Sequence, residues 1–130
     1  MSYIKLFKAT DDSEISVAPT TTNAVNFTLR TDLNEVGSYQ KLYALANDGY
    51  ICSVVKITPT GTTATKWQLD SDVAGSPSGS PGAYGAALAL GTVGDTTKVY
   101  FWARAKALDT ETPANDVTVT LVASGVAAAE

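Results

Sequence analysis

The chain contains no histidine and a single cysteine, Cys52, among its 130 residues. Without histidine it cannot build a Ser-His-Asp or Cys-His nucleophilic site, and the commonest zinc ligand sets are excluded as well. A single cysteine cannot form a disulfide bond within the chain, so disulfide bonds do not stabilise the fold. Cys52 lies in the apolar run "YICSVV", where we expect it to be a small buried hydrophobe. A P-loop and a dinucleotide-binding fingerprint are also missing, so we expect no cofactor.

Charge is scarce, and no long apolar run is present. Charged residues make up 17% of the chain against 45% hydrophobic residues, and the net charge is −4. An acidic chain of this kind lacks the basic footprint of a nucleic-acid-binding protein. No stretch approaches the roughly 20 apolar residues of a membrane span. The N-terminus has neither a basic region nor an apolar core, so we expect no signal peptide and synthesis in the cytoplasm.

The sequence shows the pattern of short strands with turn residues between them. Alternating apolar and polar residues predict about seven to nine strands and no long helix, which is typical of an antiparallel β-sandwich. We therefore expect an all-β chain that forms one domain over residues 1–130. The expected segments are an N-terminal strand or arm (1–10), a regular strand (23–31), a hairpin around Asp48-Gly49 (40–60), a Gly/Ser/Pro-rich loop (73–86), a short strand (86–91), a closing strand (117–123) and a tail that frays unless an assembly holds it (124–130).

The stretch "VYFWARAKA", residues 99–107, places three aromatic residues next to one another. Successive side chains of a strand point to opposite faces, so Phe101 is expected in the core, with Tyr100, Trp102 and Arg104 on the other face. The three rings therefore do not form one stacking platform. The outward set fits ordinary cross-strand packing, and it also fits a partner-binding surface, because Trp, Tyr and Arg dominate interface hot spots.

Carboxylates are the remaining side chains that could act in catalysis or bind a metal ion, and they form three clusters in the sequence. Their members are Asp11, Asp12 and Glu14; Asp70 and Asp72; and Asp109, Glu111 and Asp116. We expect them at strand ends and in loops, exposed to solvent, and we expect no enzyme, since paired carboxylates need a deep cleft. Asp70 and Asp72 are weak candidates for calcium ligands, but the glycine and glutamate of an EF-hand loop are missing.

From "TKWQLDSD" to the end, the order of features resembles bacterial and viral immunoglobulin-like sandwich modules. A Trp-containing strand and a Gly-rich connection precede "VYFWARAKALDTETPANDVTVTLVA", which looks like the last hairpin of such a fold. The core cysteine pair of antibody domains is missing. A small, acidic, cysteine-poor domain of this kind also resembles the capsid decoration and accessory tail proteins of tailed bacteriophages.

That resemblance implies a non-enzymatic structural protein of the virion, docked on the major capsid protein or on neighbouring subunits, with self-association possible. The residues expected to bind partners are Tyr3, Phe7, Trp67, Tyr84, Tyr100, Trp102 and Arg104. Two other functions remain open. Trp67, Tyr84 and Trp102 would stack on sugars in a carbohydrate-binding module, and the threonine-rich strands fit a self-assembling surface or fibre subunit.

Overall fold

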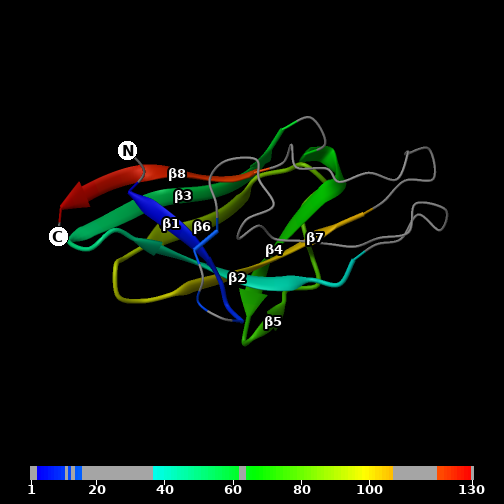
Figure 1. Ribbon diagram of the computed structural model, residues 1–130, viewed down its shortest axis with the longest axis horizontal. Coiled ribbons are helices and arrows are strands. Elements are labelled where there is room, and N and C mark those ends of the chain that lie inside the picture. Colours follow the sequence, from blue (N-terminus) through cyan, green and yellow to red (C-terminus); the bar gives the residue numbers. More distant parts are fainter. Residues whose placement is uncertain are drawn as a thin grey trace.

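The structure, a computed structural model, describes residues 3–10, 12, 14–15, 37–61, 64–106 and 120–129, and it is a β-sandwich (Figure 1). One antiparallel sheet has five strands in the order β1-β2-β7-β4-β5, and the other has three in the order β6-β3-β8. The described strands are β1 (Ile4–Lys8), β2 (Gln40–Ala46), β3 (Tyr50–Thr60), β4 (Trp67–Val73), β5 (Ser76–Pro77), β6 (Leu88–Val93), β7 (Val99–Ala105) and β8 (Thr120–Ala129). The 3₁₀ turn η2 (Ala64–Lys66) precedes β4. The predicted all-β fold is confirmed.

The core lies between the two sheets and is built from the inward residues of each strand. The largest fully buried apolar side chains are Phe101, Leu42, Ile57, Val55 and Val93. In β7, Phe101 and Ala103 are fully buried while Tyr100 and Trp102 are only half-buried on the opposite face. The period-two division of residues 99–105 is therefore confirmed. Burying an aromatic ring such as Phe101 stabilises the fold by about 2 to 3 kcal/mol.

The hairpin predicted for residues 40–60 is wrong. Gly49 adopts a φ of 84° and the Tyr50 N–H donates to Asn47 O at 3.0 Å, so the turn does form. However, β2 pairs with β1 and β7, whereas β3 pairs with β6 and β8 in the other sheet. The turn is held to the β6–β7 connection instead, because Gly49 N–H donates to Asp95 Oδ2 at 2.8 Å. The two strands bury their apolar residues against each other across the core.

The predicted last hairpin is also wrong, since β7 lies in the five-stranded sheet and β8 in the three-stranded sheet. The tail expected to fray is instead ordered as strand. β8 continues to Ala129, which pairs with Tyr50 at the start of β3. The eleven residues of β3 provide a template longer than the closing strand predicted from the sequence, and backbone hydrogen bonding extends along it. The expected strand 23–31 and the first three residues of the expected closing strand, 117–119, lie outside the described residues.

The Gly/Ser/Pro-rich segment 73–86 starts in the last residue of β4 and contains the two-residue strand β5. β5 is an edge strand, in keeping with the expectation that this segment could not form a central strand. The short strand expected after it is confirmed as β6, whose Leu88 and Leu90 pack against the core.

β3 contains a β-bulge at Val54 and Val55, where two residues face one residue of β8. The pairing of β3 with β8 passes from Ser53–Val126 to Lys56–Ser124, so Gly125 lies opposite the bulge. Val54 has a φ of 53°, in the left-handed region that β-branched residues avoid. Its side chain is 67% exposed, so the strain is not offset by burial.

Replacing Val54 with asparagine is expected to raise the free energy of unfolding by about 1 kcal/mol, because Asn tolerates the left-handed conformation. The measurement is equilibrium denaturation by urea. Val126→Asn is the matched control, since Val126 is 65% exposed in β8 and its φ is not positive. Equal effects of the two substitutions would show that Val54 is not strained.

Candidate functional site

The outer face of the five-stranded sheet gathers the outward aromatic and basic side chains. The strand register places Tyr43 beside Tyr100, and Lys41 beside Trp102. We call this surface the aromatic–cation face, and its members are Phe7, Tyr39, Lys41, Tyr43, Tyr100, Trp102 and Arg104. The sequence predicts Tyr100, Trp102 and Arg104 on one face, and the fold adds the β2 residues by pairing β2 with β7.

Cations cover the rings of this face. Lys41 Nζ lies 4.4 Å from the centre of the Tyr100 ring and 5.6 Å from that of Trp102. The Arg104 guanidinium lies 4.5 Å from the Tyr39 ring centre. Each such contact contributes about 0.5 to 1 kcal/mol at an exposed site. The ring faces are thus partly occupied within the chain itself.

Polar contacts also hold the face from its β4 side. Trp102 Nε1–H donates to Asp72 Oδ1 at 2.9 Å. Arg104 Nε–H donates to Gln68 Oε1 at 2.8 Å, and Gln68 Nε2–H donates to Gly82 O at 2.7 Å. The 78–86 segment is therefore tied to the sheet through Gln68. Tyr84 of this segment lies under Lys106, whose Nζ is 4.1 Å from its ring centre.

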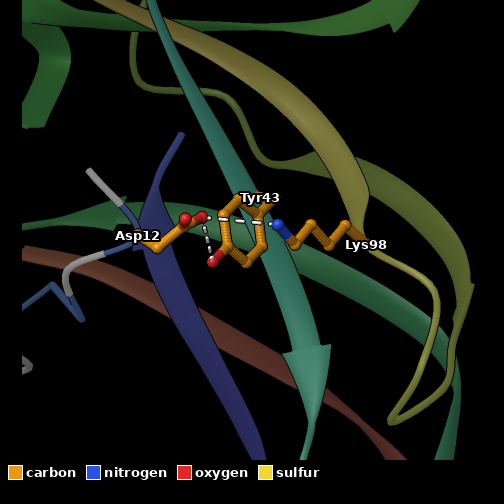
Figure 2. A network of polar contacts seen from close by, with 3 residues as sticks. All are labelled: Asp12, Tyr43 and Lys98. Atoms are coloured by element: carbon orange, nitrogen blue, oxygen red, sulfur yellow. Dashed lines mark hydrogen bonds and ion pairs between the residues drawn. The ribbon is translucent and has the colours of Figure 1, made fainter. Parts of the chain in front are cut away.

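Tyr43, Asp12 and Lys98 form a polar network at the β1 side of the face (Figure 2). The Tyr43 hydroxyl donates to Asp12 Oδ1 at 2.8 Å, and Lys98 Nζ lies 3.4 Å from the same oxygen. Phe7 stacks on Tyr43 with ring centres 5.0 Å apart. Burial, and then the hydrogen bond to Asp12, raises the pKa of Tyr43 from 10.0 to about 12.

This pKa shift predicts a loss of stability in alkali. Because the pKa of Tyr43 is higher in the folded chain than in the unfolded one, its contribution is complete below about pH 10 and is lost as the pH rises through about 12. Tyr43→Phe is expected to cost about 1 kcal/mol at neutral pH through the lost hydrogen bond and to make the fall between pH 10 and 12 shallower. Urea denaturation across this pH range measures both effects. Tyr3→Phe, on an exposed ring, should retain the full fall; if Tyr43→Phe retains it too, the network does not govern alkaline stability.

Asp70, expected to be exposed to solvent, is buried in β4 at 2% exposure. It accepts hydrogen bonds from Ser71 N–H at 2.8 Å, from Gly79 N–H at 3.2 Å and from the Ser78 hydroxyl. Asp72 accepts from Trp102. The carboxylates of Asp70 and Asp72 therefore both accept hydrogen bonds from other groups of this chain. Within the described ranges, no group of three or more His, Cys, Asp or Glu side chains could hold a metal ion. Asp11, Asp109, Glu111 and Asp116 lie outside those ranges.

The predicted partner-binding residues do not all lie on one surface. Phe7, Tyr100, Trp102 and Arg104 share the aromatic–cation face, with Tyr84 at its border. Trp67 instead packs against the core from the opposite side of the sheet. Tyr3 is 38% exposed and lies against Tyr50, with ring centres 4.8 Å apart.

The three-stranded sheet has an apolar outer surface that the sequence-based list does not include. We call it the apolar strip, and its members are Ile51 and Val54 of β3 and Val122 and Val126 of β8, exposed by 36%, 67%, 45% and 65%. Lys56 is the only charged side chain in β3, β6 and β8. The alternation of β3 could have revealed Ile51, but the bulge at Val54 breaks that alternation and residues 124–130 were expected to fray.

Cys52 is 1% exposed, and burial raises the pKa of its thiol. The thiolate, which is the reactive form, is therefore disfavoured at neutral pH. In the described residues, no helix is long and apolar enough to cross a membrane. A comparison with protein-family models, with curated proteins and with solved structures finds no match to this chain.

Proposed function

We propose that this protein is a non-enzymatic structural component of a virus particle, most specifically a capsid decoration protein of a bacteriophage that binds the assembled shell. The observation that carries the proposal is the apolar strip on the three-stranded sheet. Four exposed branched aliphatic side chains on two neighbouring strands form a surface that water solvates poorly. The resemblance in size, charge and composition to phage decoration proteins supplies the class of partner.

The strip is largely apolar, as the centres of protein interfaces are. Lys56, which is exposed and lies opposite Ser124 within the strip, is the only charged side chain in β3, β6 and β8. Small side chains, including Ser53, Ser124 and Ala128, surround the valines and allow close approach of a flat partner surface. A capsid subunit that presents a complementary apolar surface is the partner we propose.

The aromatic–cation face supports this assignment by contrast. Its rings are already packed by Lys41 and Arg104, and Trp102 Nε1–H is bonded to Asp72. A partner would have to displace these contacts before binding. The carbohydrate-binding alternative is disfavoured as well, because Trp67 and Trp102 lie on opposite faces of the same sheet and cannot stack on one sugar chain.

The test is density-gradient fractionation of lysate from the source organism, with each fraction probed for this chain. We expect the protein to travel with DNA-filled particles. Free protein at the top of the gradient, or protein that follows the cell envelope, would overturn the proposal.

Purified protein then tests the surface by rebinding to particles stripped of it. Val54→Lys places a second charge in the strip, two residues from Lys56, and is expected to lower occupancy at least about tenfold, since charge is disfavoured at interface centres. Val73→Lys is the matched control, because Val73 is 57% exposed and lies in β4 of the other sheet. If both variants rebind like the unmodified protein, the strip is not the docking surface.

A further inference from the structure

We infer that β8 pairs with β8 of a second copy of this chain, antiparallel and about a two-fold axis at Gly125. Two three-stranded sheets would thereby join into one six-stranded sheet. This inference concerns self-association and does not depend on the proposed function.

The first argument is the outer edge of β8. In the part of the chain that the structure describes, β8 is hydrogen-bonded to β3 on one side, and no described strand pairs with its other side (Figure 1). The strand is ten residues long. A strand at a sheet edge presents a row of backbone N–H and C=O groups directed away from the sheet, which is a template for another strand.

The second argument comes from the other edges, which carry the features that prevent such pairing. β1 has two lysines, Lys5 and Lys8, and a bridge between Phe7 and Glu14 adds a further segment beside it. β5 has only two residues. β6 pairs with β3 through two shifts of register, so its backbone is irregular. Charge, shortness and bulges are the usual protections of an edge. Residues 121–129 of β8 contain no charged residue and no proline.

The third argument identifies the occupant as a second copy. A strand that pairs along the whole of β8 needs a long edge of its own without charge or proline. Among the described edge strands, β8 is the longest that has such an edge, so the chain itself supplies the matching strand. The net charge of −4 opposes association of two copies and favours contact through uncharged residues such as those of β8.

Symmetry is also satisfied. A two-fold axis perpendicular to the sheet places one residue opposite its own copy and pairs residues on the same face. With Gly125 at the axis, Ser124 lies opposite Val126 of the second copy, and Val122 lies opposite Ala128. All four belong to the outer face and are exposed. On the inner face, Ala123 lies opposite Ala127, so small residues meet where the backbones must approach.

The expected dimer has a modest affinity, since a single strand pair buries less than the roughly 1,200 Å² of a stable standard interface. Size-exclusion chromatography with light scattering, over a range of concentrations, should show a reversible dimer. Val126→Lys places two like charges next to the axis and is expected to raise the dissociation constant about tenfold. Val73→Lys is the control: Val73 is 57% exposed and lies in β4 of the other sheet, outside the apolar strip, so this variant should dimerise like the unmodified protein.

Disulfide trapping tests the register. Chains with Ser124→Cys and chains with Val126→Cys should cross-link when mixed under mild oxidation, and much less when each is oxidised alone, because paired strands hold opposite Cα atoms at about 4.5 to 5.5 Å. Cys52 is buried and should not compete. Cross-linking of either variant alone would move the axis away from Gly125 and overturn the register. A protein that is monomeric at every concentration, or that forms filaments, would overturn the pairing itself. Association with particles by a monomeric protein would leave the proposed function intact.

Discussion

Replacing Asp70 with alanine is expected to lower the free energy of unfolding by about 3 kcal/mol, because hydrogen bonds to a charged group are strong and their donors would be left buried. The carboxylate is 2% exposed and accepts from three groups, of which Ser78 and Gly79 belong to the segment that follows β5. Asp70 thereby fastens this segment to the outer face of β4. Its removal should loosen the segment as well as destabilise the sheet.

Urea denaturation measures the stability, and hydrogen exchange at the Gly79 amide measures the local loosening. Asp72→Ala is the matched control, since Asp72 lies two residues along the same strand and is only half-buried. Asp72→Ala removes the hydrogen bond from Trp102 Nε1–H and should lower the free energy of unfolding by about 1 kcal/mol. If Asp70→Ala costs no more than Asp72→Ala, burial of the carboxylate does not have the structural role assigned to it.

Gly125→Ala is expected to cost about 2 kcal/mol, in the usual range for overpacking. A Cβ atom at this position would lie 3.0 Å from Ser53 O and 3.0 Å from Val55 Cγ2, and both of these atoms belong to β3, at or next to the bulge. The backbone oxygen cannot move without shifting β3. Gly125→Val should cost more, since its extra methyl groups enlarge the conflict.

The sign of the change in unfolding free energy caused by Gly125→Ala tests whether this close contact exists. Without the contact, Gly→Ala stabilises a protein by about 0.4 to 1 kcal/mol because it restricts the unfolded chain. Ser124→Ala, one residue away on the exposed face, is the control and should be close to neutral. A stabilising Gly125→Ala, measured by thermal or urea unfolding, would show that β8 and the bulge are less tightly packed than the structure has them.

Strand positions and faces could be predicted from the sequence because period-two alternation is a local property. In β7 this alternation assigns Phe101 to the core and Trp102 to the outer face correctly. The choice of partner strand is not local. Asn47, Asp48 and Gly49 do form a turn, but turn chemistry does not specify whether the next strand joins the same sheet or crosses to the other one.

The parts of the candidate site that the sequence analysis missed have similar causes. Asp70 was expected in solvent because a carboxylate normally lies there, and its burial depends on donors eight and nine residues further along the chain. Tyr43 joins the aromatic–cation face only because β2 pairs with β7. The apolar strip needs the bulge at Val54 and the pairing of residues 124–129, and neither follows from local pattern.

The repeated crossing of the chain between the two sheets also constrains how this chain folds. β3, the central strand of its sheet, has both of its partners later in the chain, and its first residue, Tyr50, pairs with Ala129. Most strand pairs therefore form only after a long loop has closed, and this closure costs conformational entropy before any contact is made. Proteins with such contacts fold slowly, in about milliseconds to seconds. During synthesis β3 has neither of its partner strands until β6, and then β8, have emerged from the ribosome. Each new molecule thus completes its second sheet only after translation has reached Ala129.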